Sequence, residues 1–193
     1  MEHFEETLPE GYKLVKTVDA KDKKTVVIMN IAAGVVAAAL VVAAFFIFDP
    51  FADFNGEHLL VREIVLIASM LVYIVAHELT HGAAYKLLTH RKLTFGMTLS
   101  VAFCGVPDIY VYRTAALTAL LAPFTVFTVL FGLLVFLVPG NFDKFLASLL
   151  FAVHFSGCVG DLYDTALYIF RFRDKTTLMN DTGPKQTFYV KDK

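Results

Sequence analysis

The stretch TVVIMNIAAGVVAAALVVAAFFIF, residues 25–48, contains no charged side chain. A helix that crosses the hydrocarbon core of a bilayer needs about 20 consecutive, mostly apolar residues. A second uncharged stretch of sufficient length, TAALTALLAPFTVFTVLFGLLVFLV, covers residues 114–138. Two further apolar stretches, at 64–88 and 145–170, are long enough but are interrupted by ionisable side chains. The sequence therefore predicts four membrane-spanning helices.

The composition supports a chain in contact with a lipid bilayer. Hydrophobic residues make up 57% of the 193 residues and charged residues 18%, whereas soluble domains average about 45–50% and about 25%. The 17 basic residues nearly balance the 18 acidic ones, so no basic surface for nucleic acid is expected. These values exclude a disordered chain and a nucleic-acid-binding domain.

Basic residues predict the orientation of the helices. With both termini in the cytosol, only Arg62 and Lys144 of the 17 Lys and Arg fall in external loops, which agrees with the positive-inside rule. The charge bias and the short loops favour a prokaryotic cytoplasmic membrane. We expect a cytosolic tail at 1–24, a four-helix membrane domain at 25–173 and a second cytosolic tail at 174–193.

A different pattern lies between the second and third predicted helices. Every second residue from Phe95 to Phe103 is apolar, which is typical of a half-buried strand. A strand at 94–103, a turn at 104–108 and a short strand at 109–112 would form a hairpin; a surface loop on the lipid headgroups is the alternative. The expected fold is therefore an all-α integral membrane protein with about four transmembrane helices and a small cytosolic β-hairpin between helices 2 and 3. A further strand is expected at 187–190.

The second predicted helix contains the motif His-Glu-Leu-Thr-His at residues 77–81. On a helix, His77 and His81 project from one face and can bind a single metal ion. Glu78 lies beside them, where it can accept a proton from a water molecule that a zinc ion activates. Two structural histidines are the alternative, but each ionisable residue in a membrane helix costs about 2.5–3.5 kcal/mol. The motif therefore predicts a zinc site with Glu78 as the catalytic base.

A catalytic zinc ion needs a third protein ligand, and the fourth predicted helix offers three candidates. Helices rise by about 1.5 Å per residue, so His77 and His81 lie at depths of about 21 and 27 Å from the external end of their helix. By the same measure His154 lies at about 15 Å, Asp161 at about 26 Å and Asp164 at about 30 Å. Asp161 matches the histidines best and is predicted as the third ligand. Asp164 is the alternative ligand, or it pairs with Lys and Arg residues at the headgroups or orients a ligand. His154 is expected to contact substrate, to orient a ligand or to be a hydrogen-bonded structural histidine.

These motifs resemble those of known membrane proteases. HELTHG in a spanning helix, a β-prone segment after it, LLAPF at 120–124 and GDLYD at 160–164 together resemble the site-2-protease class of intramembrane metalloproteases. The sequence is similar above all to the putative zincin peptidase family (domain of unknown function 3267). The resemblance implies zinc held by His77, His81 and Asp161, with Glu78 as general base. The sequence differs from the site-2 pattern at Leu162, where those proteases usually carry glycine.

The predicted function is hydrolysis of peptide bonds in membrane-associated proteins or peptides, near the cytosolic leaflet. Manganese, iron or cobalt would suit the same ligands. Two other classes of function remain open: a metal-binding membrane protein without proteolysis, such as a sensor or an inactive relative, and a structural helix bundle. Zinc content and cleavage of a membrane-embedded peptide distinguish the three.

Overall fold

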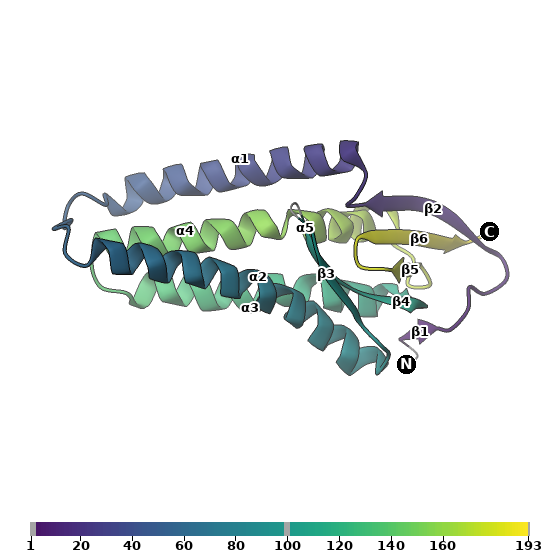
Figure 1. Cartoon of the computed structure of the whole chain (residues 1–193). Coiled ribbons are helices and arrows are strands. Elements are labelled where there is room, and N and C mark those ends of the chain that lie inside the picture. The colour runs from purple at the N-terminus through teal and green to yellow at the C-terminus, as the bar shows by residue number, and fades with distance from the viewer. Residues whose placement is uncertain (1–2, 99–100, 193) are drawn as a thin grey trace. The chain divides into compact units, whose positions relative to one another are not determined.

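The computed structural model describes residues 3–98 and 101–192 (Figure 1). The helices are α1 (Lys23–Phe48), α2 (Leu59–Thr89), α3 (Arg113–Leu137), α4 (Asn141–Gly157), α5 (Val159–Ala166) and the π-helical η1 (Leu167–Arg171). The strands are β1 (Phe4–Glu5), β2 (Tyr12–Asp19), β3 (Thr94–Met97), β4 (Ala102–Tyr112), β5 (Leu178–Asp181) and β6 (Lys185–Lys191).

Three helices, α1, α2 and α3, are long and apolar enough to cross a membrane. The predicted fourth span is broken: α4 is followed by the segment Val159–Arg171 at an angle of 42°. The two together would count as a fourth span within the described part of the chain. Gly157 and Gly160 lie on either side of this break, and glycine weakens a helix. The prediction of long apolar helices is therefore confirmed for three of them.

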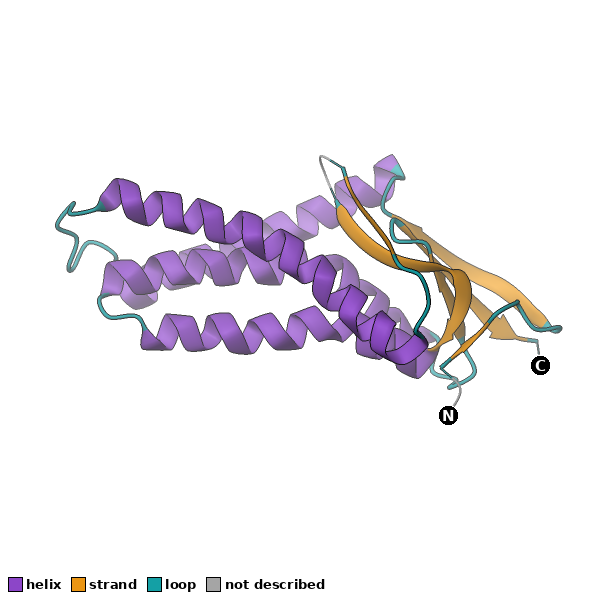
Figure 2. Ribbon diagram, turned by 60° about the horizontal axis from the view of Figure 1, so that its bottom comes forward, coloured by secondary structure: helices purple, strands orange, loops and turns teal. Residues whose placement is uncertain are grey.

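The expectation of an all-α fold with one small hairpin is wrong. All six strands belong to one antiparallel sheet with the order β1-β4-β5-β6-β2, and β3 pairs with β4 (Figure 1; orange in Figure 2). Four of the strands, β1, β2, β5 and β6, come from the segments expected to be tails. The short strand predicted at 187–190 is confirmed as part of β6.

The hairpin also differs from the prediction in its turn. Thr98 donates its backbone N–H to the carbonyl of Val101 at 2.7 Å, so the chain reverses between β3 and β4 rather than at 104–108. Leu99, one of the alternating residues, lies outside the described residues. The predicted turn residues form part of β4, where the pairing with β5 shifts register between Val106 and Val111. The side chain of Asn180 donates to the carbonyls of Pro107 and Ile109 there, which replaces lost strand hydrogen bonds.

The chain divides into two compact units. One unit comprises residues 1–28, 76–123 and 160–193, and therefore contains the sheet, the HExxH motif and α5. Its core includes Tyr85, Val106, Tyr168 and Phe188, all fully buried. The other unit comprises residues 29–75 and 124–159, which are mostly helical.

A close approach in the sheet leads to the first testable prediction. A Cβ atom on Gly105 in β4 would lie 2.2 Å from the backbone nitrogen of Gly183, and a backbone atom cannot move aside as a flexible side chain can. We expect Gly105→Ala to lower the free energy of unfolding by about 1–3 kcal/mol or more, measured by thermal unfolding in detergent. Gly34→Ala is the control, because a Cβ there meets no atom within 4 Å. Equal melting temperatures for the two variants would contradict this packing.

Candidate metal centre

The two histidines of the motif lie on one face of α2. Both His77 and His81 are buried, each with 7% of its surface exposed, and their Nε2 atoms lie 3.1 Å apart. The helix continues for two further turns and ends at Thr89. His90 then adopts a positive φ of 55°, and Lys86 donates to the backbone carbonyl of His90, so the chain leaves the helix in a left-handed C-terminal cap.

Asp161 in the first turn of α5 completes the group. Its Oδ2 atom lies 3.2 Å from His77 Nε2, and its Oδ1 atom lies 3.3 Å from His81 Nε2. Ligand atoms about 2.0–2.1 Å from a tetrahedral zinc ion are themselves about 3.3 Å apart. The observed separations of 3.1–3.3 Å therefore fit a zinc ion with little movement of the side chains.

The predicted alternatives lie elsewhere. Asp164 is buried at 3% exposure, but it is not among the atoms that converge with the two histidines. Its Oδ1 atom has no hydrogen-bond partner among the described residues.

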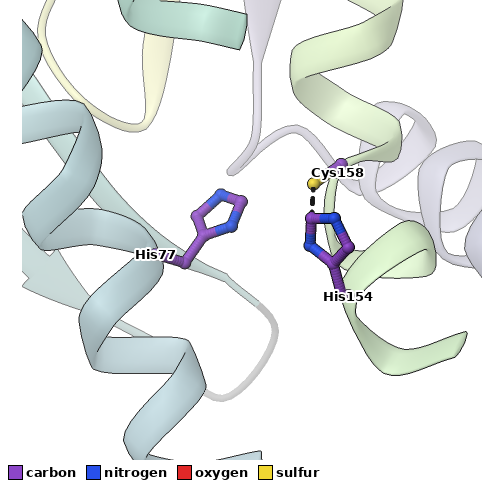
Figure 3. Close-up of side chains that lie close together, drawn as sticks. All are labelled: His77, His154 and Cys158. Carbon is purple, nitrogen blue, oxygen red and sulfur yellow. Dashed lines mark hydrogen bonds between the residues drawn. The ribbon is translucent and has the colours of Figure 1, made fainter. Parts of the chain in front are cut away.

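His154, in the unit that holds residues 124–159, is fully buried and bonded at both ring nitrogens. Its Nδ1 lies 3.0 Å from the hydroxyl of Tyr73, and its Nε2 lies 3.0 Å from that of Thr128. The Sγ atom of Cys158 lies 3.6 Å from Nδ1, as the dashed line in Figure 3 marks. These contacts are those of a hydrogen-bonded structural histidine, which was one of the predicted roles.

Glu78 is half-buried beside the histidines. Its carboxylate interacts electrostatically with His81, His77 and Asp161. A carboxylate next to a metal-binding pair can accept a proton from a water molecule in the same site.

The outer nitrogen of His81 is held by a backbone group of α3. Its Nδ1 atom lies 2.8 Å from the carbonyl oxygen of Ala119. A carbonyl oxygen can only accept a hydrogen bond, so Nδ1 is the donor. In the neutral ring, the lone pair is then on Nε2, the atom that faces His77 and Asp161, as a metal ligand requires.

A second buried contact, which the sequence did not reveal, follows one turn later on α2. Tyr85 is 1% exposed and donates its hydroxyl to Oδ2 of Asp181 in β5 at 2.7 Å. Asp181 also accepts from the backbone N–H of Gly183 and from the side chain of Gln186. The one available signal was the spacing of Tyr85, four residues after His81. Asp181 lies in a segment that was expected to be a tail.

Two imidazole nitrogens and a carboxylate suit zinc and several other divalent metals. An HExxH helix with a carboxylate converging on its histidines is the arrangement of the zincin class of metallopeptidases. The chain belongs to the putative zincin peptidase family, whose sequence pattern matches residues 70–177. No curated protein and no solved structure matches the chain. Membership in this family supports a metallopeptidase with zinc as its metal.

The burial of Asp181 predicts a specific pH dependence of stability. Burial raises the pKa of Asp181 from its ordinary value of 3.8 to about 6. The folded protein then holds this proton more tightly than the unfolded chain, so stability decreases as the pH rises from about 4 to about 6. The Asp181→Asn variant lacks this contribution, while its carboxamide can still form a hydrogen bond with the Tyr85 hydroxyl. We expect the variant to gain stability relative to the wild type over this range, by on the order of 3 kcal/mol.

Thermal unfolding of both proteins at pH 4 and pH 7 measures this difference, because all other titrating groups are common to the two. A difference in melting temperature that is the same at both pH values would contradict a raised pKa for Asp181.

Proposed function

We propose that this protein is a membrane-embedded zinc metalloprotease, similar to the site-2 class, that hydrolyses peptide bonds of membrane-associated substrates near the cytosolic leaflet. His77, His81 and Asp161 are the metal ligands, and Glu78 is the general base. The observation that carries the proposal is the convergence of His77 Nε2, His81 Nε2 and the Asp161 carboxylate, at separations of 3.1–3.3 Å. The family match over 70–177 supports the same activity.

The chemistry requires one group that moves a proton. Zinc, when bound, lowers the pKa of water and polarises the carbonyl under attack. Glu78 accepts the proton of the attacking water and returns it to the leaving amine. The hydrogen bond from His81 to Ala119 holds the imidazole in the orientation that exposes Nε2.

The surface of the long helices supports a location within the membrane. Large apolar side chains are exposed along α1, α2 and α3, among them Val35, Phe46, Leu71 and Phe136. Soluble monomers rarely expose apolar patches of more than a few hundred Å². Lipid would cover these side chains.

A substrate strand can add to the edge of β3, which pairs with β4 alone among the described residues. A peptide bond inside a helix is hidden by its own hydrogen bonds, and strand addition holds a peptide extended. Phe95 in β3 lies against Gly82, because a Cβ on Gly82 would be 2.6 Å from its ring. Gly82 directly follows His81, so this edge passes beside the HExxH helix.

The backbone pairing indicates which groups β3 offers. Thr98 and Val101 form a hydrogen-bonded pair at the turn, and such pairs alternate along an antiparallel ladder. Gly96, opposite Phe103, is therefore hydrogen-bonded to β4, whereas the N–H groups of Phe95 and Met97 point to the open edge.

The first experiment measures zinc content and cleavage in the same preparations. We expect Glu78→Gln to retain about one zinc per chain and to lose cleavage of a membrane-embedded peptide, because it removes the base but no ligand. Elemental analysis and a proteoliposome cleavage assay provide the two measurements. Cleavage by the Glu78→Gln variant at the wild-type rate would refute this mechanism.

Ligand variants provide the controls. His77→Ala and Asp161→Ala should lose zinc, because two protein ligands hold the ion poorly. Asp164→Asn should keep it, since Asp164 lies outside the converging group. A variant Asp164→Asn without zinc would instead favour Asp164 as the third ligand.

The edge of β3 is tested by proline at one position. Met97→Pro removes an N–H from the open edge, where proline is tolerated, and leaves the ladder to β4 intact. We expect a higher KM or loss of cleavage with normal zinc content. Met97→Ala is the matched control, because it shortens the exposed side chain and keeps the N–H. Equal KM values for the two variants would exclude strand addition at this edge.

A further inference from the structure

Pro123 lies inside α3, eight residues after Ala115, the first of several buried alanines on this helix. Proline has no backbone N–H, so it leaves the carbonyl four residues earlier without its helical donor. That carbonyl belongs to Ala119. In an apolar environment an unpaired carbonyl is costly, and another group must take the place of the missing donor.

The replacement donor is a predicted metal ligand. The Nδ1–H of His81 donates to the Ala119 carbonyl at 2.8 Å. At most 1% of the surface is exposed in each of three alanines on α3, Ala115, Ala116 and Ala119. Small side chains on this face leave room for the imidazole to reach the backbone of α3.

We propose that Pro123 is a positioning residue of the metal centre, because it reserves the Ala119 carbonyl for His81. Any other residue at 123 would bring an N–H that bonds to Ala119 within the helix and draws its carbonyl toward the helix axis. With proline, the carbonyl accepts from Nδ1 of His81, and Nε2 is held toward His77 and Asp161. This inference rests on the proposed function of the site, since it assigns His81 as a ligand.

A positioning role and a structural role for Pro123 predict opposite effects on the melting temperature when the proline is replaced. Replacing a helical proline by alanine restores a hydrogen bond and a good helix former, so Pro123→Ala should keep or raise the melting temperature of the metal-free protein. The same variant should bind zinc about tenfold more weakly, the usual effect of losing an outer partner of a histidine ligand. Competition with a chelator of known affinity measures the zinc affinity.

Two further variants separate the effect of a backbone N–H at position 123 from the effect of helix propensity. Pro123→Gly also restores the donor but is a poor helix former, so it should weaken zinc binding as alanine does while lowering the melting temperature. Pro139→Ala is the control, because Pro139 follows the end of α3 at Leu137 and contributes nothing to the Ala119 carbonyl. Its zinc affinity should equal that of the wild type.

A measurement without metal tests the hydrogen bond directly. In the metal-free, ¹⁵N-histidine-labelled protein, the Nδ1 proton of His81 should exchange slowly, and Pro123→Ala should shift it or speed its exchange. The ring protons of His154 are the internal control and should not change. Wild-type protein that binds no zinc would contradict the proposed function. An unchanged His81 resonance, or an unchanged zinc affinity in both Pro123 variants, would overturn the role of Pro123.

Discussion

A polar group buried among apolar helices is costly unless it has a partner within the protein, and the candidate site depends on this constraint. The clearest case is the hydrogen bond from His81 to the Ala119 carbonyl. It satisfies a backbone group that Pro123 leaves open, and it directs the other ring nitrogen toward Asp161. A requirement of helix stability and a requirement of metal binding are thus met by the same contact.

The same constraint explains a polar stripe along α2. Tyr73, His77, His81 and Tyr85 follow one another at four-residue intervals, so they share one face of the helix, and all four are buried. Within its own unit, each has a polar partner: Tyr73 bonds to His154, the two histidines meet Asp161, and Tyr85 bonds to Asp181.

Sequence reasoning succeeded where the signal was local, because uncharged stretches located α1 and α3. Matching of depths along the helices selected Asp161, whose carboxylate lies beside the two histidines; its role as a ligand stays a prediction. The sheet was missed because β1 pairs with β4, β2 with β6 and β4 with β5 across long separations. In β2 the pairing with β6 slips between Leu14 and Lys16, which breaks the alternation that reveals a strand. Asp181 was missed for the same reason, since a tail offers no partner for a buried carboxylate.

The pairing of β2 with β6 has a consequence for biosynthesis. Tyr12 in β2 lies opposite Lys191 in β6, so most of the chain must be translated before the two strands can meet. Contacts between distant segments form slowly. The HExxH helix at Leu59–Thr89 is therefore already translated while β2 still lacks its neighbour. The protein completes its sheet only after the ribosome has released residues 185–191, so the sheet is the last part of the fold to form.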